Sequence, residues 1–141
     1  MGRGPMSREE SAAALARYQR HWTEHGFGLL AVEDRESGRL IGRAGPQLHR
    51  LWPSDPELGW GLDPGCWGRG LATEAGRACL EWAFGDLGVR RLVSITTPEN
   101  AASRRVMEKL GFSLLEELPD PDLGITLLVH AREPGREVRS P

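Results

Sequence analysis

The chain has 141 residues, 39% of them hydrophobic and 27% charged, and a formal net charge of −2 at pH 7, which predicts one globular domain. The balanced charge argues against a nucleic acid or an anionic membrane as partner, and no apolar run approaches the roughly 20 residues that span a bilayer. With no secretory signal pattern and only two cysteines, Cys66 and Cys79, too few for a disulfide framework or a thiolate zinc site, we expect a cytoplasmic protein.

The N-terminal half predicts a helix, a β-hairpin and a loop. Residues 7–10 (S-R-E-E) match a capping box that starts a helix, and Gly26 is a suitable C-terminal stop. Three apolar residues recur on one face of this helix: Leu15, Tyr18 and Trp22. Two strands, 27–33 and 39–45, follow as an antiparallel hairpin. Residues 46–56 contain three prolines and no clear period, so we expect a loop there.

The segment 57–75 (E-L-G-W-G-L-D-P-G-C-W-G-R-G-L-A-T-E-A) organises the rest of the chain. It predicts a strand over 57–62, a glycine-rich turn over 63–70 and a helix that begins near Leu71. This arrangement directs several backbone N–H groups to one point, with the positive end of the helix dipole behind them. We interpret that point as an anion site that grips the pyrophosphate of a cofactor.

The faces of these two elements carry further expectations. On the strand, Glu57, Gly59 and Gly61 share one face, and the paired glycines indicate close approach by a ligand or another backbone. The helix is expected to end by Gly85 or Gly88. Its inward face is expected to hold Leu71, Ala75, Ala78, Cys79 and Trp82. Its outward face is expected to hold Thr73, Glu74, Arg77 and Glu81.

The C-terminal half predicts a strand, a helix and two more strands. Residues 91–97 form a strand that runs parallel to the one before the glycine turn, because a helix connects them. Asn100 caps the next helix, which Gly111 closes. Strands over 112–118 and 124–130 complete a mixed sheet with helices on both faces, so the fold class is mixed α/β. One domain then covers residues 1–130, and we expect residues 131–141 to be a disordered tail.

Other interpretations of these patterns are weaker. A dinucleotide-binding fingerprint fits poorly because Thr73 stands at the third glycine position, and no G-K-[ST] follows the turn, which excludes a P-loop. Residues 21–25 match the H-x-x-E-H pattern of a class of zinc peptidases. No further acidic ligand stands out and His49 and His130 stand alone, so we expect no metal.

Two segments carry a family resemblance. Residues 64–75 (P-G-C-W-G-R-G-L-A-T-E-A) and residues 100–112 (N-A-A-S-R-R-V-M-E-K-L-G-F) resemble the acyl-CoA loop and the second signature of the GNAT N-acetyltransferase superfamily. Their wording is most similar to the branch of ribosomal-protein N-terminal alanine acetyltransferases (RimJ/RimL-like). The resemblance covers about residues 7–130. It implies a mostly antiparallel sheet whose two central parallel strands splay apart around acetyl-CoA.

The resemblance also implies which residues hold the cofactor. The pantetheine arm would pair with the strand backbone, the pyrophosphate would lie on the N–H groups of the glycine turn, and the helix of residues 100–110 would line the thiol. The residues implied are Trp60, Leu62, Trp67, Gly68, Arg69, Gly70, Leu71, Ala72, Thr73, Asn100, Ala102 and Ser103. Asn100 also has a structural interpretation as a helix cap, and Trp67 as core packing.

The chain departs from the family pattern in two ways. Family members usually carry a further strand and helix before the helix that begins at Ser7. A truncated product, a shorter fold that suffices, or a partner such as a second copy covering the exposed sheet edge would each explain the difference. Many relatives also carry a tyrosine where Met107 stands, as the acid that protonates the departing thiolate. In the branch resembled here, the serine at the position of Ser103 is the proposed substitute.

The expected function is direct transfer of an acetyl group from acetyl-CoA to a small-molecule or peptide amine. Glu57 is the expected base, through water, and Ser103 the expected partner of the leaving thiolate, although a solvated strand-end charge and a polar helix residue are their structural interpretations. The alternative is an acyl-CoA-binding or regulatory module without turnover, which Met107 favours. A protein N-terminus, an antibiotic amine and a polyamine all stay open as acceptors, because variable segments, here 46–56 and 118–124, are expected to wall the acceptor pocket.

Overall fold

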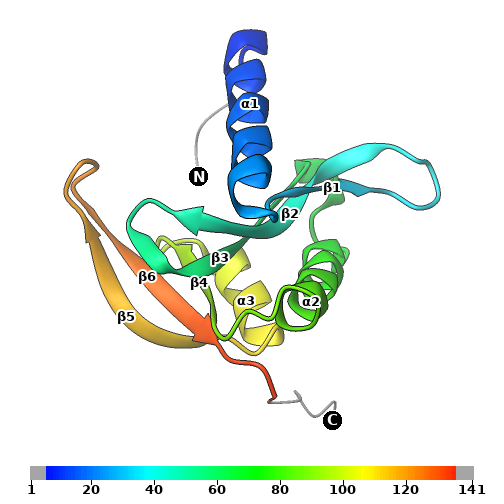
Figure 1. Ribbon diagram of the computed structural model, residues 1–141. Coiled ribbons are helices and arrows are strands. Elements are labelled where there is room, and N and C mark those ends of the chain that lie inside the picture. Colours follow the sequence, from blue (N-terminus) through cyan, green and yellow to red (C-terminus); the bar gives the residue numbers. More distant parts are fainter. Residues whose placement is uncertain (1–5, 136–141) are drawn as a thin grey trace.

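A computed structural model describes residues 6–135 as one six-stranded sheet with helices on both sides (Figure 1). The strand order is β1-β2-β3-β4-β6-β5, and every neighbouring pair is antiparallel except β3–β4. In Figure 1, α1 lies on one face of the sheet and α2 and α3 lie on the other. This confirms the predicted mixed α/β fold. The elements are α1 (Arg8–His25), β1 (Leu30–Glu33), β2 (Leu40–His49), β3 (Trp52–Leu62), the 3₁₀ turn η1 (Pro64–Cys66), α2 (Leu71–Phe84), β4 (Leu92–Thr96), α3 (Ala101–Lys109), β5 (Ser113–Asp120) and β6 (Ile125–Arg132).

The ends of α1 are those that the sequence predicts. The Ser7 hydroxyl accepts the backbone N–H of Glu10 at 3.1 Å, and the Glu10 carboxylate accepts the N–H of Ser7 at 3.0 Å. Gly26 ends the helix with a φ of 74°, a left-handed conformation that favours glycine. The predicted apolar face is only partly right, because Leu15 is 59% exposed and the buried residue of the helix is Ala14.

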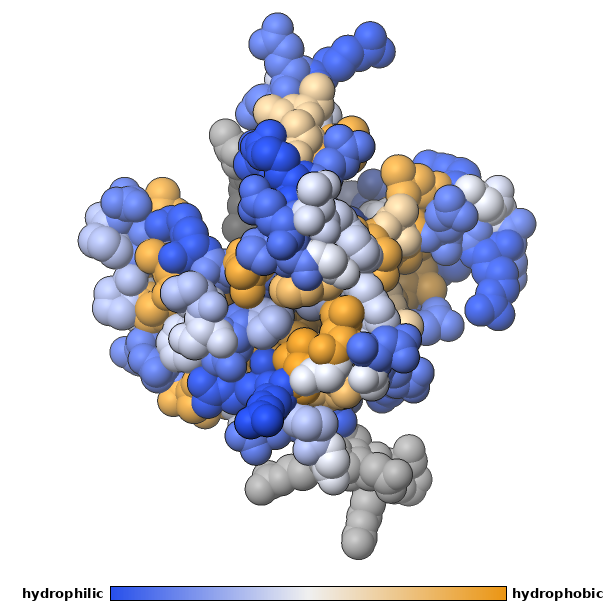
Figure 2. Space-filling view, in the orientation of Figure 1, coloured by the Kyte–Doolittle hydropathy of each residue, from blue (hydrophilic) through white to orange (hydrophobic). Residues whose placement is uncertain are grey.

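The far end of α1 is fixed by Trp22. Its indole N–H donates to the carbonyl of Leu29 at 2.8 Å, just before β1 begins. Its ring stacks on Trp82 of α2, with 5.6 Å between the ring centroids. Most of the visible face of α1 is hydrophilic (Figure 2), so we infer that contacts at this end hold the helix. No helix in the described part of the chain has the length and apolar character needed to cross a bilayer.

The predicted loop over residues 46–56 is wrong, because most of it belongs to β2 and β3. The strands pair at Gln47–Glu57 and again at His49–Trp52, so residues 53–56 of β3 face a single residue of β2. This is a bulge, where a strand tolerates proline because no ladder N–H is required. Pro53 and Pro56 therefore mark an irregular stretch of strand rather than a connection, while Pro46 pairs with Leu58 in the regular part of β2.

The core lies between the sheet and the helices α2 and α3. Its buried members are Ala44, Leu58, Cys79, Leu80, Ala83, Leu92, Met107, Leu110 and Phe112. The inward face of α2 differs from the prediction, since Thr73 and Gly76 are buried and Ala78 is exposed. Gly76 is the reason, because a Cβ there would stand 2.6 Å from the Leu110 side chain. The glycine lets α3 pack directly onto α2 and sets which side of α2 faces inward.

The last hairpin, β5–β6, is longer than predicted and is tied to the β2–β3 turn. Its strands extend to Asp120 and Arg132, so the ordered chain passes the predicted boundary at residue 130, and residues 136–141 of the expected tail lie outside the described residues. Arg50 of the β2–β3 turn pairs with Asp120 and Asp122 of the hairpin. The buried Asp120 also accepts the backbone N–H groups of Asp122 and Leu123. The two segments predicted as acceptor walls therefore contact each other.

Candidate functional site

The site lies where the two parallel strands, β3 and β4, separate. They pair at Glu57–Val93 alone, and the buried Ser94 hydroxyl then donates to the Leu58 carbonyl at 3.0 Å. Since backbone groups alternate sides along a strand, those of Trp60, like those of Leu58, face the gap toward β4. The sequence predicts this splayed pair correctly. On this side of β3, the backbone beyond Glu57 pairs with no strand of the described chain. It is therefore open to a ligand.

The glycine-rich turn closes one end of this gap. Gly68 and Gly70 have φ values of 79° and 73°, and Gly70 starts α2 with no side chain capping the helix. The first N–H groups of α2 are thus left for an anion, which the helix dipole also favours. Trp67 donates its indole N–H to the Leu62 carbonyl at 2.9 Å and is 60% exposed. It ties the turn to the end of β3 instead of packing in the core.

A cavity of about 770 Å³ runs from this turn to α3. All but one of the predicted cofactor-binding residues line it: Trp60, Leu62, Trp67, Gly68, Gly70, Leu71, Ala72, Thr73, Asn100, Ala102 and Ser103. Arg69 is exposed and does not line it. The wall of this cavity also contains Cys66, Arg105 and Lys109. Arg105 and Lys109 add positive charge on α3. We refer to it as the large cavity.

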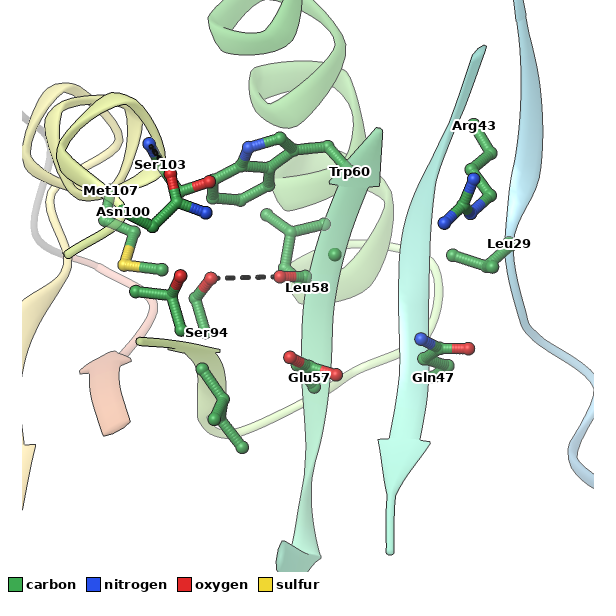
Figure 3. Close-up of a pocket in the computed structure, with 13 residues that line it drawn as sticks. Leu29, Arg43, Gln47, Glu57, Leu58, Trp60, Ser94, Asn100, Ser103 and Met107 are labelled. Carbon is green, nitrogen blue, oxygen red and sulfur yellow. Dashed lines mark hydrogen bonds between the residues drawn. The ribbon is translucent and has the colours of Figure 1, made fainter. Parts of the chain in front are cut away.

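A second cavity of about 210 Å³, the small cavity, adjoins the large one. The two share Trp60, Asn100 and Ser103 as lining residues. Figure 3 shows these three residues at one end of the small cavity, with Glu57 and Gln47 at the other. A molecule that follows the gap from the glycine-rich turn therefore reaches Glu57.

Glu57 is buried, with 8% of its surface exposed, so the interpretation as a solvated strand-end charge is wrong. Burial raises its pKa from 4.5 to about 7, and a hydrogen bond from the Ile95 backbone opposes the rise only in part. A carboxyl group with this pKa can accept a proton near neutral pH and release it again. Because Glu57 lines the small cavity, such a proton transfer would take place there.

The first turn of α3 supplies the opposite wall. The Asn100 side chain accepts the backbone N–H of Ser103 at 3.1 Å, so Asn100 is a helix cap as predicted, and it also lines both cavities. Ser103 has its hydroxyl group beside the junction of the cavities (Figure 3). Met107 is buried and lines the small cavity, where its thioether has no proton to donate.

The surroundings of the histidines indicate structural roles. The imidazole Nε2 of His21 accepts the N–H of Leu48 at 3.0 Å, and its Nδ1 contacts the carbonyl of Phe27 at 2.9 Å, so the ring joins α1 to β2. Burial lowers the pKa of both His49 and His130. Within residues 6–135, no group of three His, Cys, Asp or Glu side chains is placed to hold a metal ion.

Sequence reasoning missed Arg43 and Gln47, two residues of β2 that line the small cavity. They lie on one strand face because they are four positions apart. The alternation that places them there continues past Gly45, where the predicted strand stopped. Finding them required the register of β2 on β3, in which Arg43 faces Gly61 and Gln47 faces Glu57.

Comparison with known proteins gives a consistent result. Residues 1–113 match the family described as "Acetyltransferase (GNAT) domain". The chain is 33% identical to an uncharacterized protein of Bacillus subtilis, YkkB, over 94 residues, which are 66% of this chain and 55% of YkkB. The chain spans about half the length of the curated relatives it matches.

Solved structures share the fold. An acetyltransferase from Agrobacterium tumefaciens aligns with a TM-score of 0.78 and 34% identity over 92% of this chain and 74% of that one. The ribosomal-protein-S5-alanine acetyltransferase of Vibrio fischeri aligns with a TM-score of 0.76 over 95% of this chain and 79% of that one. At 17% identity, the second likeness concerns the fold alone.

Proposed function

This chain belongs to the GNAT acetyltransferase family, and on that premise we propose that it transfers the acetyl group of acetyl-CoA directly to a primary amine. The wording of residues 100–112, with a serine at 103 and a methionine at 107, further supports the RimJ/RimL-like branch. The acceptor in that branch is a protein N-terminus, whereas the walls of the small cavity decide the acceptor of this chain.

The observation that carries the proposal is the continuity of the two cavities. The pyrophosphate of CoA fits the glycine-rich turn, where the N–H groups at the start of α2 meet the dipole of the helix. The pantetheine amides fit the gap, where they can pair with the backbone of Trp60 as a strand would. The thioester then lies at the junction lined by Trp60, Asn100 and Ser103. An amine in the small cavity approaches it from the side of Glu57.

The reaction proceeds by attack of the neutral amine on the thioester carbonyl carbon. Glu57 takes the ammonium proton, directly or through a water molecule, which its pKa of about 7 suits. The new C–N bond turns the carbonyl into a tetrahedral oxyanion, which backbone N–H groups of β3 at the gap can stabilise. The C–S bond then breaks, the carbonyl re-forms, and CoA leaves as a thiolate.

The thiolate needs a proton or a hydrogen bond as it departs. Ser103 lines both cavities and carries a hydroxyl group that can donate a proton in place of the tyrosine of many relatives. The buried Met107 has no proton to donate. We therefore assign the thiolate to Ser103. If this assignment is right, Ser103→Ala lowers kcat while the affinity for acetyl-CoA is retained.

The test uses two measurements on the same protein. Calorimetry with CoA and acetyl-CoA measures binding, and release of free thiol with a panel of amines measures transfer. Binding together with amine-dependent thiol release supports an acetyltransferase. Binding without release from any amine supports a module without turnover, and absence of binding overturns both.

A further inference from the structure

Arg43 lines the small cavity, and in the described part of the chain its side chain has no hydrogen-bond or ion-pair partner. It extends from β2 on the side opposite α3 (Figure 3). Within residues 6–135, neither an ion pair nor a hydrogen bond reaches the Arg43 guanidinium. An unpaired guanidinium in a concave site presents five N–H donors in a fixed fork. Such a group is suited to bind an anion that the cavity admits.

The strand beneath Arg43 is shaped to hold its side chain. Arg43 faces Gly61 across the β2–β3 pair, and a Cβ at Gly61 would stand only 3.4 Å from the guanidinium. The side chain thus lies along the bare strand surface. Two residues along the same face, Gly59 leaves room beside the Gln47 amide, whose nitrogen is 3.8 Å from the place of a Cβ. The paired glycines predicted to accept a ligand therefore form a floor, with Arg43 at one end and Gln47 and Glu57 at the other.

This floor separates two opposite chemical roles. The end with Glu57 takes up a proton, so the amine belongs there, while the end with Arg43 carries a permanent positive charge. Arg43 faces Gly61 and Gln47 faces Glu57, and Gly61 and Glu57 are four residues apart, about 13 Å along a strand, so the amine of a small molecule bound at Arg43 reaches Glu57 through a water molecule. A second ammonium group near Arg43 would be repelled, which disfavours a polyamine.

The size of the small cavity adds a limit on the acceptor. Its volume of about 210 Å³ is below the roughly 300–1,000 Å³ of pockets for drug-sized ligands. A small molecule fits better than a bulky one. The acetyl group of the cofactor enters the small cavity from the large one. Little of the small cavity is then left for long substituents on the acceptor.

We propose that the acceptor is a small amine that carries a carboxylate, in the simplest case a free amino acid, and that Arg43 binds this carboxylate. The proposal rests on the acetyl transfer proposed above. The planar fork of Arg43 matches a carboxylate bidentately, with Gln47 as a further donor in the same wall. Arg43 is then a residue that determines specificity, and Glu57 keeps its role in proton transfer.

The experiment compares each amino acid with its own carboxamide as acceptor, by kcat/KM with acetyl-CoA. The amide has almost the same shape without the charge, and it also represents a protein N-terminus, whose α-carbonyl is an uncharged amide. We expect at least one amino acid to exceed its amide by roughly tenfold or more, as charge-assisted bonds predict. In Arg43→Gln the ratio falls to about one, and in Arg43→Lys it is intermediate, because the charge stays and the fork is lost.

The matched control is Arg39→Gln. Like Arg43, Arg39 is an exposed arginine, but it lies just before β2 and lines neither cavity. It should keep the ratio of the wild type. Preference for amides, for spermidine or for no acceptor type in an otherwise active protein overturns the proposal and leaves acetyl transfer standing.

A second readout does not need turnover. N-acetylated amino acids and their N-acetylated amides are titrated by calorimetry into protein saturated with CoA, or into free protein if CoA does not bind. Tighter binding of the acid, lost in Arg43→Gln, supports the carboxylate site even in a protein without transfer activity. Equal binding of acid and amide, or binding of neither, overturns it.

Discussion

The substitution Glu57→Gln should make the protein more stable and less active at the same time. Burial of Glu57 raises its pKa from 4.5 to about 7, so ionisation costs the folded protein about 3 kcal/mol relative to the unfolded chain, at ~1.36 kcal/mol per tenfold change. A raised pKa of an acid means that the unfolded chain binds fewer protons between these two values. The destabilisation is therefore absent below pH 4.5, grows as the pH rises, and is complete above pH 7. Glutamine has the same shape, can accept the Ile95 N–H, and does not ionise.

Urea unfolding of the wild type and Glu57→Gln at pH 5 and pH 8 measures this effect. We expect the variant to gain up to about 3 kcal/mol over the wild type at pH 8 and much less at pH 5, while kcat falls by roughly 10²–10⁴. Glu117→Gln, a change at an exposed carboxylate of β5, should alter neither. Equal stabilities of variant and wild type at both pH values would refute the reasoning. A loss of stability with unchanged kcat would show that Glu57 is structural.

Three further substitutions test the glycine-rich turn and the sheet. Gly70→Ala should weaken acetyl-CoA binding in calorimetry, because φ is 73° there and an L residue costs roughly 1–2 kcal/mol in that conformation. The control is Gly65→Ala, at a glycine without positive φ or close neighbours, which should bind acetyl-CoA as the wild type does. Ser94→Ala should lower the free energy of unfolding by about 1–3 kcal/mol, since a buried β3 carbonyl loses its donor. Burial, and then Arg104, lower the pKa of His130, so stability that is present above pH 6.5 is lost as the pH falls. His130→Leu should flatten that acid-side loss in unfolding curves, and an unchanged slope would contradict this.

The parts of the fold that the sequence predicts are those set by local chemistry. A capping box, a helix-ending glycine and an asparagine cap each need only a few neighbouring residues, and Ser7, Gly26 and Asn100 all act as expected. The parallel pairing of β3 and β4 also follows from local information, because a helix between two strands favours it. The residues of the large cavity could be predicted for a similar reason, since two continuous motifs supply nearly all of them.

The parts that the sequence does not predict depend on partners distant in the chain. Proline normally ends a strand, and only the register of Gln47 on Glu57 reveals that residues 53–56 form a bulge. The inward side of α2 depends on the close approach of Leu110 to Gly76. Arg43 looked like any charged residue of a hairpin strand until its pairing with Gly61 placed it in the wall of the small cavity.

The single pairing between β3 and β4 has a consequence for how the chain folds. The sheet divides at this seam into two halves that are also continuous in sequence, residues 30–62 and residues 92–132. Inside each half the strands pair over several residues, whereas the seam pairs at one residue of each strand. The ion pair of Arg50 with Asp120, which also joins the halves, connects residues 70 positions apart, and the entropy cost of such a contact comes before its reward. We therefore expect the seam to form last. A ligand held in it stabilises contacts that the folding transition state lacks, so it prolongs the life of the folded protein without hastening its formation.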